Sequence, residues 1–254
     1  MTAAAVILAV SAGRGVSTIW AAAAILSGQL FIGWLNDFHD RDLDRAAGRR
    51  DKPIASGEIA EATVRNAAVI AGLACVPLSF ANGAAAGALH LAAVALAVLY
   101  NLALKSSPLS VVPYLLAFGS VPAFITLGLP HPHLPPMWVL FGAGLLGAGA
   151  HFTQVLPDIE DDRRQGIRGL PQLLGVRASA VAAALLLAGS ALVILLGPGH
   201  PGELQLVALA IVLLGVVGIV VTALGDRRRL SFRLTLVAAA GIAALFLLSG
   251  RALA

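Results

Sequence analysis

Residues 203–224 read ELQLVALAIVLLGVVGIVVTAL, a run in which Glu203 is the one charged residue. A helix needs about 20 consecutive apolar residues to cross the hydrocarbon core of a bilayer, and this run has that length. Its apolar residues do not alternate with polar ones, which excludes the strand of an outer-membrane barrel. A helix that is apolar nearly all round needs lipid or other helices as its surroundings. The run therefore predicts a membrane-spanning helix.

The whole chain has the same character. It has 254 residues, of which 59% are hydrophobic and 12% charged, and its mean hydropathy is +0.90. A soluble domain carries about 25% charged residues, so this chain has too few to cover a surface that faces water. The composition excludes soluble, disordered, collagenous and coiled-coil proteins. It indicates a polytopic helical membrane protein.

Similar apolar runs recur along the chain. We expect eight long spans, near 16–36, 60–80, 84–104, 109–129, 137–157, 177–197, 203–224 and 232–250. A shorter apolar stretch, 3–12, is counted as a first helix. The predicted fold class is therefore all-α: one transmembrane domain, residues 1–254, with about nine membrane helices. The single cysteine, Cys75, lies in an apolar run, so no disulfide can form within the chain.

The basic residues define the orientation. The formal charge is +4 and the isoelectric point is near 10.0. When the spans are counted off, all Lys and Arg except Arg14 and Arg251 fall on one face. The positive-inside rule makes that face cytoplasmic. Basic cytoplasmic loops explain the charge, so no nucleic-acid partner is expected, and the membrane is expected to be a bacterial plasma membrane.

The acidic residues form two clusters on that same face. The first reads NDFHDRDLD over 36–44. If the helix of the preceding span continues through it, Asn36, Asp40 and Asp44 lie on one stripe, each about one turn beyond the last. The second cluster reads DIEDD over 158–162, with Asp158 and Asp162 one turn apart. Like charges along one stripe destabilise a helix, and a bound cation removes that penalty.

The donor types point to a hard ion. Oxygen ligands suit Mg²⁺, which keeps several waters and shares its coordination shell with substrate phosphates. Two facing Asp stripes therefore suggest a diphosphate held between metal ions. The alternative, two ordinary solvated loops, explains neither the repeated spacing nor the matched placement at the ends of two spans.

These motifs resemble those of a known family. NDFHDRDLD resembles the N-D-x-x-D-x-x-x-D signature of the UbiA-type intramembrane prenyltransferases, to which the 4-hydroxybenzoate polyprenyltransferases belong. DIEDDRRQG, over 158–166, resembles the family's second signature, and KPIASG, over 52–57, resembles its basic-Pro-x-x-x-Gly loop. Tyr100 followed by Lys105 resembles its third, basic motif. The layout of nine spans with the N-terminus inside is also the family's.

The resemblance implies a central cavity between the helices and a Mg²⁺-dependent transfer of an isoprenyl group from its diphosphate to a small, often aromatic, acceptor. Two Mg²⁺ ions are expected. One would be held by Asn36, Asp40 and Asp44, and the other by Asp158 and Asp162. The diphosphate would be bound by Lys105, with Arg45 and Arg163 as further candidates. The expected catalytic residues are Asp40, Asp44, Asp158, Asp162 and Lys105, and the active site would open on the cytoplasmic side.

Polar residues inside the spans are candidates for the cavity wall. His151 and Gln154 share a helix face with Asp158, and intramembrane polar groups usually point into a bundle or cavity. Lining the cavity and hydrogen bonding between helices are both possible roles. Tyr100 and Tyr114 are further candidates for contact with the substrate. GAGLLG, over 142–147, matches a nucleotide-binding pattern, but it lies inside an apolar run and fits close helix packing instead.

Other functions remain open. A terpene cyclase or a transferase of prenyl phosphate to a sugar would use the same scaffold. A transporter would place its ionisable residues near the bilayer midplane, whereas the carboxylates here lie at the span ends.

Overall fold

The computed structural model describes residues 1–46, 48–49, 52–199, 201–225 and 227–249. Within these ranges the chain is helical throughout, with no strand. The α-helices, in chain order, are α1 (Thr2–Ser11), α2 (Thr18–His39), α3 (Arg41–Ala46), α4 (Pro53–Ser56), α5 (Glu61–Phe80), α6 (Ala84–Leu102), α7 (Val112–Leu127), α8 (Met137–Val155), α9 (Ile159–Arg164), α10 (Leu170–Leu174), α11 (Val176–Leu196), α12 (Glu203–Leu224) and α13 (Arg228–Leu248). Two short 3₁₀ turns, η1 (Gly15–Ser17) and η2 (Leu104–Ser106), precede α2 and follow α6.

Six of these helices, α2, α5, α6, α11, α12 and α13, are long and apolar enough to cross a membrane. The chain is therefore an integral membrane protein. The expected number of nine spans is not confirmed. α8 has 19 residues but carries His151 and Gln154 in its last turns. α7 has 16 residues and α1 has 10, so both are shorter than a full crossing.

The expected spans and the observed helices agree closely in the middle of the chain. The span 203–224 coincides with α12, and 60–80 and 84–104 match α5 and α6 within two residues. The largest difference is at α13, which begins at Arg228, four residues before the expected 232. The expected start was taken from the first apolar residues. A helix can continue beyond them through charged residues whose side chains reach water, so the expected start came too late.

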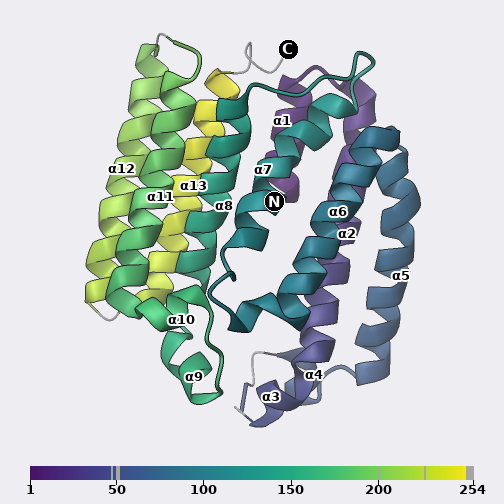
Figure 1. The fold of residues 1–254 in the computed structure, drawn as a ribbon, viewed down its shortest axis with the longest axis vertical. Coiled ribbons are helices and arrows are strands. Elements are labelled where there is room, and N and C mark those ends of the chain that lie inside the picture. The colour runs from purple at the N-terminus through teal and green to yellow at the C-terminus, as the bar shows by residue number, and fades with distance from the viewer. Residues whose placement is uncertain (47, 50–51, 200, 226, 250–254) are drawn as a thin grey trace.

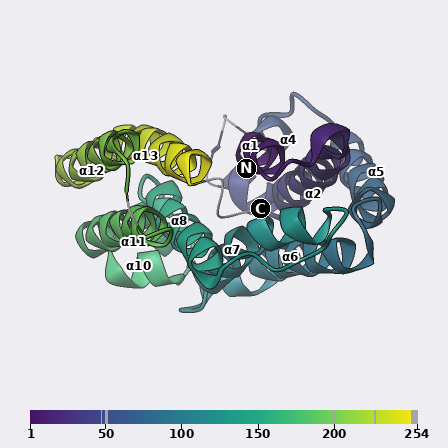
Figure 2. The same ribbon diagram turned by 90° about the horizontal axis from the view of Figure 1, so that it is seen from above.

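The long helices run alongside one another in one bundle (Figure 1), and α13, the last of them, also contacts α1, the first helix of the chain. Seen from above, α11, α12, α13 and α8 gather on one side and α1, α2, α5 and α6 on the other, with α7 between them (Figure 2). The neighbours in the chain pack side by side: α12 on α13, α2 on α5, and α7 and α11 on α8. The short helices α3, α4, α9 and α10 lie together at one end of the bundle (Figure 1).

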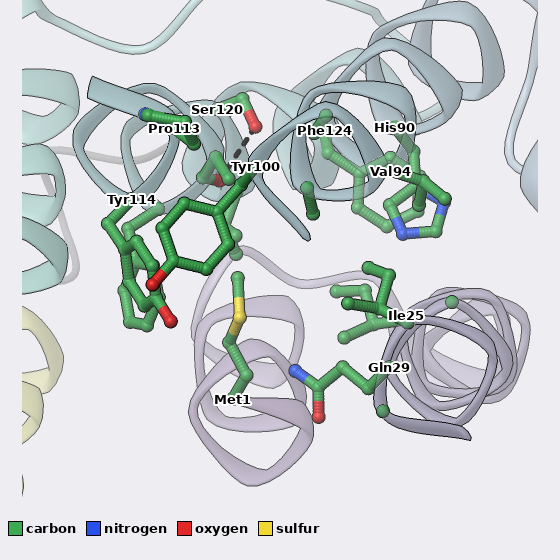
Figure 3. Close-up of a pocket in the computed structure, with 18 of the residues that line it drawn as sticks. Met1, Ile25, Gln29, His90, Val94, Tyr100, Pro113, Tyr114, Ser120 and Phe124 are labelled. Atoms are coloured by element: carbon green, nitrogen blue, oxygen red, sulfur yellow. Dashed lines mark hydrogen bonds between the residues drawn. The ribbon is translucent and has the colours of Figure 1, made fainter. Parts of the chain in front are cut away.

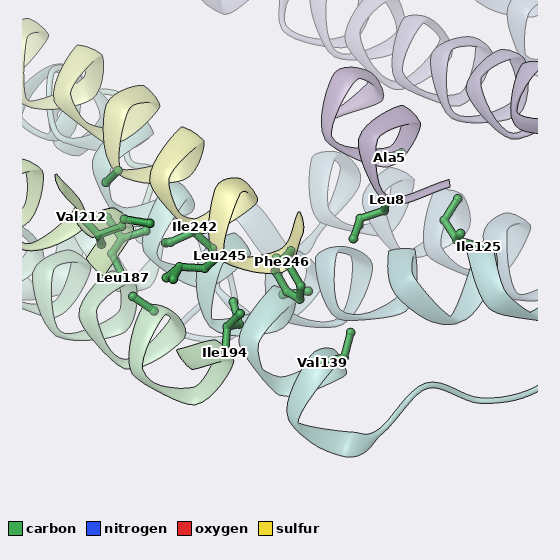
Figure 4. Close-up of a cluster of buried hydrophobic side chains, with 14 of the residues drawn as sticks. Ala5, Leu8, Ile125, Val139, Leu187, Ile194, Val212, Ile242, Leu245 and Phe246 are labelled. Atoms are coloured by element: carbon green, nitrogen blue, oxygen red, sulfur yellow. The ribbon is translucent and has the colours of Figure 1, made fainter. Parts of the chain in front are cut away.

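The buried core lies mainly between α8, α11, α12 and α13. Leu187, Ile194, Val212, Ile242 and Leu245 are completely buried there (Figure 4). Large apolar side chains also cover the outside of the bundle. The most exposed include Leu214, Leu185, Leu73 and Ile70. A protein with so many exposed apolar side chains would aggregate in water. The outer surface of the bundle is instead suited to contact with lipid tails.

Glycines allow α8 to approach its two neighbours closely. A Cβ atom added at Gly147 would lie 2.5 Å from the carbonyl oxygen of Tyr114 on α7, and one at Gly149 would lie 2.8 Å from Cγ of Leu187 on α11. At Gly144 it would lie 2.9 Å from the carbonyl oxygen of Leu115. The expected packing role of the glycine pattern in 142–147 is confirmed.

Candidate active site

The first acidic motif begins inside a helix and passes beyond its end. α2 ends at His39, and Asp40 is its C-cap residue. The amide of Asp40 donates to the carbonyl of Asn36 at 2.9 Å, and the amide of Asp44 donates to that of Asp40 at 2.8 Å. These bonds keep the helical spacing across the junction with α3. Asn36, Asp40 and Asp44 therefore follow one another at one-turn intervals, as the sequence predicted.

Lys105 binds the middle residue of this motif. Its Nζ lies 2.6 Å from both carboxylate oxygens of Asp40. Lys105 comes from η2, just after α6, and both side chains are mostly buried, with 17% and 14% of their surface exposed. Asn36 donates a further hydrogen bond from Nδ2 to Asp40 Oδ2 at 3.3 Å. The ring of His39 is a third partner, with Nδ1 3.0 Å from Asp40 Oδ1. Three side chains thus hold the carboxylate of Asp40.

The second acidic motif forms the start of α9. Asp158 is the N-cap residue, and the amide of Asp162 donates to the carbonyl of Asp158 at 2.8 Å. The expected one-turn spacing of these two residues is therefore present. Gln172 on α10 donates from Nε2 to Asp162 Oδ2 at 2.7 Å. This bond fixes the carboxylate of Asp162 against the neighbouring short helix.

Two cationic side chains join the motifs. Arg49 Nη1 lies 3.9 Å from Asp158 Oδ2, and the backbone amide of Arg49 donates to the carbonyl of Asp44 at 3.0 Å. Lys105, bound to Asp40, also lies within electrostatic reach of Asp162. The two motifs come from different parts of the chain, at the ends of α2 and α8, and converge at one end of the bundle (Figure 1).

Burial changes the acidity of two of these carboxyl groups. It raises the pKa of Asp162, although the hydrogen bond from Gln172 acts in the opposite direction. It also raises the pKa of Asp44, against the attraction of Lys52 and Arg49. Desolvation disfavours the charged form of a carboxyl group, and a cation nearby favours it. A bound cation would therefore stabilise the ionised forms of Asp44 and Asp162.

Two of the expected diphosphate-binding residues point elsewhere. Arg45 forms an ion pair with Glu61 at 2.5 Å, at the start of α5. Arg163 donates from Nε to the carbonyl of Gln172 at 2.5 Å and from Nη2 to that of Leu173 at 3.3 Å. Arg45 thus joins α3 to α5, and Arg163 joins α9 to α10. Arg45 also pairs with Asp42, which lies in the first acidic motif but off the stripe of Asn36, Asp40 and Asp44. Of the three predicted cations, Lys105 alone pairs with a proposed metal ligand in the part of the chain that the structure describes.

Two residues of this site, Arg49 and Gln172, were not singled out from the sequence, and a third, Lys52, was noted only as part of a motif. Arg49 stands beside Arg50 in a polar loop, where nothing in the spacing distinguished it. Gln172 lies ten residues beyond Asp162, and its role depends on how α10 folds back on α9. Lys52, known from the basic-Pro motif, binds Asp37 at 2.5 Å. The motif was the one signal that could have paired Lys52 with the acidic cluster.

A cavity of about 510 Å³ opens beside this site, between α2, α6 and α7. Tyr100, Tyr114 and Gln154 line it (Figure 3). The hydroxyl of Tyr114 donates to Gln154 Oε1 at 3.4 Å, and the two tyrosine rings meet edge to face, with centroids 5.2 Å apart. Tyr100 lies in the last turn of α6, just before η2, which carries Lys105. The tyrosines therefore stand where the cavity meets the two acidic motifs.

His151 does not line this cavity. Its ring is buried behind the tyrosines, 4.4 Å from that of Tyr114 between centroids. Its Nε2 lies 3.3 Å from Ser110 Oγ, and Ser110 Oγ accepts a hydrogen bond from the amide of Leu170 at 3.0 Å. The structure therefore places His151 against the rings of Tyr100 and Tyr114 and not among the residues that line this cavity, although Gln154, on the same face of α8, does line it. The hydrogen-bonding alternative fits its position.

The donor set fits a divalent ion that is completed by a substrate. Carboxylate and amide oxygens are the ligands that Mg²⁺ prefers. Among the described residues, no three His, Cys, Asp or Glu side chains converge closely enough to hold an ion by themselves. Mg²⁺ is typically held by one or two carboxylates together with phosphate oxygens and waters, which this arrangement can supply.

Proteins with known names have sequences similar to this chain. The chain is 30% identical over 197 residues to the 4-hydroxybenzoate octaprenyltransferases of Salmonella paratyphi B and Salmonella newport, a match that covers 72% of this chain. The chain spans 65% of the length of these curated relatives.

Solved structures share the fold. A UbiA homologue from Aeropyrum pernix superposes with a TM-score of 0.77 at 21% identity, covering 94% of this chain and 95% of the other. A UbiA homologue from Archaeoglobus fulgidus, bound to GPP and Mg²⁺, superposes with a TM-score of 0.67 at 18% identity, covering 95% and 93%. The model of the UbiA prenyltransferase family matches residues 1–234. The chain therefore belongs to the UbiA prenyltransferase family.

Proposed function

We propose that this chain is a membrane prenyltransferase. It transfers an isoprenyl group from an isoprenyl diphosphate to a small acceptor, and residues 1–254 act as one domain. The observation that carries the proposal is the convergence of the two acidic motifs on Lys105 and Arg49, at the mouth of a cavity lined by tyrosines. Such a site offers cations and metal ligands for a diphosphate and an apolar space for the group it carries.

Five residues are proposed to hold Mg²⁺. Asn36, Asp40 and Asp44 would bind one ion, and Asp158 and Asp162 a second. A family member from Archaeoglobus fulgidus has been solved with GPP and Mg²⁺ and with DMAPP and Mg²⁺, which supports both the metal and the class of substrate. Bound there, the metal would neutralise the diphosphate as it leaves.

Lys105 and Arg49 are proposed to bind the diphosphate directly. Both already lie against carboxylates of the site, so phosphate oxygens that enter would exchange for those partners. Charge-assisted hydrogen bonds from these groups strengthen as the bond from carbon to oxygen breaks and negative charge builds up on the leaving group. Gln172 would keep the carboxylate of Asp162 in place.

Tyr100 and Tyr114 are proposed to protect the allylic cation. Aromatic faces attract a cation, and rings that fill the mouth of the cavity exclude water that would turn the cation into an alcohol. An electron-rich carbon of the acceptor would then form a carbon–carbon bond with the cation and lose its proton to water or to the released diphosphate. The similarity to 4-hydroxybenzoate octaprenyltransferases favours an aromatic acceptor. The basic face of the chain supports a site on the cytoplasmic side of the membrane, and that membrane is proposed to be a bacterial plasma membrane.

The test uses the purified protein in detergent with Mg²⁺, radiolabelled geranyl or farnesyl diphosphate and 4-hydroxybenzoate. We expect release of diphosphate together with a prenylated acceptor. Asp40→Asn and Asp158→Asn should each abolish both products, whereas Asp42→Asn should not, because Asp42 is exposed and pairs with Arg41 and Arg45.

Two results would contradict the proposal. Undiminished turnover in Asp40→Asn and Asp158→Asn would remove the acidic motifs from the reaction. Release of diphosphate with a cyclised hydrocarbon, in the presence of every acceptor, would make the chain a terpene cyclase instead.

A further inference from the structure

The cavity extends away from the acidic motifs toward a distinct deep end. Tyr100 and His90 both line it from α6, and they are ten residues apart, which is about 15 Å along a helix axis. Tyr100 and Tyr114 stand on one side, and His90, Phe124 and Val94 gather on the other (Figure 3). A chain that entered past the tyrosines would meet His90 and Phe124 last.

Two buried rings close this deep end. The rings of His90 and Phe124 have centroids 4.9 Å apart, and Phe124 is 1% exposed. Gly28 on α2 lies opposite them. A Cβ atom there would lie 3.1 Å from Val94 Cγ2 and 3.4 Å from His90 Cε1. The side chains of Val94 and His90 are already packed closely against α2, so they cannot move outward to enlarge the cavity.

Hydrogen bonds fix the chemical character of His90. Ser79 Oγ donates its one proton to the carbonyl of Cys75 at 2.6 Å and lies 2.8 Å from His90 Nδ1. The proton of that second bond must therefore come from Nδ1. Nε2 is left as an acceptor, and no group of the described residues hydrogen-bonds to it. His90 is 9% exposed and lines the cavity.

We infer that this deep end, closed by Phe124 and carrying the bare Nε2 of His90, limits the length of the isoprenyl chain that the site accepts. The inference rests on the proposed function and deepens it. Phe124 and Val94 act by steric contact. His90 acts by polarity, because a hydrocarbon tail that covers Nε2 removes water from it and returns no hydrogen bond. The longest tail that binds well is the one that stops short of His90.

The test measures the binding of unreactive substrate analogues, which needs no knowledge of the acceptor. Geranyl, farnesyl and geranylgeranyl S-thiolodiphosphates are titrated into the full-length protein with Mg²⁺ by calorimetry. For the wild type we expect Kd to rise by about tenfold once the tail must reach His90. His90→Leu should remove that rise for the longer tails, while His90→Gln, which keeps a polar group, should retain it.

A second variant tests the steric wall. Val94→Phe fills the deep end and should weaken binding of the longest tail by about tenfold while leaving geranyl within about threefold. Its matched control is Leu96→Phe. Leu96 lies on the same helix but lines a separate apolar groove with Leu89 and Phe141. That control should bind all three analogues like the wild type.

The outcomes separate the inference from the proposed function. If no analogue binds in the presence of Mg²⁺, the proposed function fails. If all three bind with equal affinity, or if His90→Leu and Val94→Phe leave the order of affinities unchanged, the tail does not reach the deep end and this inference is overturned. The inference is supported if His90→Leu lets longer tails bind well and Val94→Phe restricts tight binding to shorter tails.

Discussion

At the scale of single residues, Lys105 decides how the acidic motifs are held. Its ammonium group occupies the face of the Asp40 carboxylate at 2.6 Å from both oxygens, which is where a bound cation would also lie. An exposed ion pair of this kind adds little to stability. Here both partners are mostly buried, so the removal of one leaves a buried charge on the other without a counter-ion.

We expect Lys105→Met to slow diphosphate release by about 10–100-fold, because one charge-assisted hydrogen bond to the leaving group is lost. Arg45→Met is the control. The sequence made Arg45 a weaker candidate than Lys105. Its ion pair with Glu61 leads away from the site, so its loss should slow the reaction less than about threefold. Steady-state rates with a labelled isoprenyl diphosphate compare the two. Equal losses would mean that Arg45 does reach the substrate.

Arg14 makes a second residue-scale contribution, to stability. It is 6% exposed and donates to Asn82 Oδ1 at 2.6 Å and to the carbonyl of Ile125 at 3.4 Å. It thereby joins the turn between α5 and α6 to the end of α7. The sequence showed Arg14 as one of two basic residues on the far face, but not that it is buried.

We expect Arg14→Met to lower the free energy of unfolding by about 2–4 kcal/mol, since Asn82 and the end of α7 lose a buried partner. Thermal unfolding in detergent, followed by circular dichroism, measures the effect. Arg65→Met serves as the reference, because Arg65 is exposed on α5 and surface changes of this kind stay within about 0.5 kcal/mol. A similar midpoint in both variants would show that Arg14 adds nothing.

At the scale of elements, apolar length predicted the helices well, because a bilayer imposes the same minimum on every span. The coincidence of α12 with 203–224 shows this. The loops were less predictable. The spacing of Asp40 and Asp44 survived because helical bonds continue past the end of α2. The partners of Arg45 and Gln172 depend on where two loops fold, and no local pattern encodes that.

The contact of α7 with α8 gives an element-scale prediction. A Cβ atom at Gly147 would clash with the Tyr114 carbonyl at 2.5 Å, so Gly147→Ala should destabilise the protein by about 1–3 kcal/mol. Gly189→Ala is the matched control, because its Cβ would lie 3.8 Å from the nearest atom, on Leu145. Helix propensity alone should make that change neutral or favourable. Unfolding midpoints that shift alike would argue against the close contact.

At the scale of the whole molecule, charge and hydropathy predicted a membrane protein in which most basic residues and both acidic clusters lie at the same end. The structure places the short helices α3 and α9, which carry the acidic motifs, together at that end (Figure 1). The loop over 130–136 connects α7 to α8 at their other ends. The orientation relative to the cytoplasm is a separate prediction, which rests on the basic residues alone.

Cysteine labelling tests that orientation. Cys75 is buried, so the wild type should react little with a membrane-impermeant maleimide. We expect Asp42→Cys and Asp161→Cys to react in inside-out vesicles, and Leu134→Cys to react in intact cells. All three positions are exposed. Reaction of Asp42→Cys from outside the cell would reverse the orientation, and reaction of all three from one side would contradict the fold.

The ion pairs at the acidic end have a consequence for the order of events in a catalytic cycle. Because Lys105 and Arg49 already serve as internal counter-ions, binding of Mg²⁺ and a diphosphate at the proposed site would be an exchange of partners and not a simple addition. A divalent ion that arrives alone must evict an ammonium group, and a diphosphate that arrives alone must face carboxylates. When both arrive together, each displaced group finds a new partner at once, so the two ligands promote one another's binding, and by thermodynamic linkage each does so by the same factor.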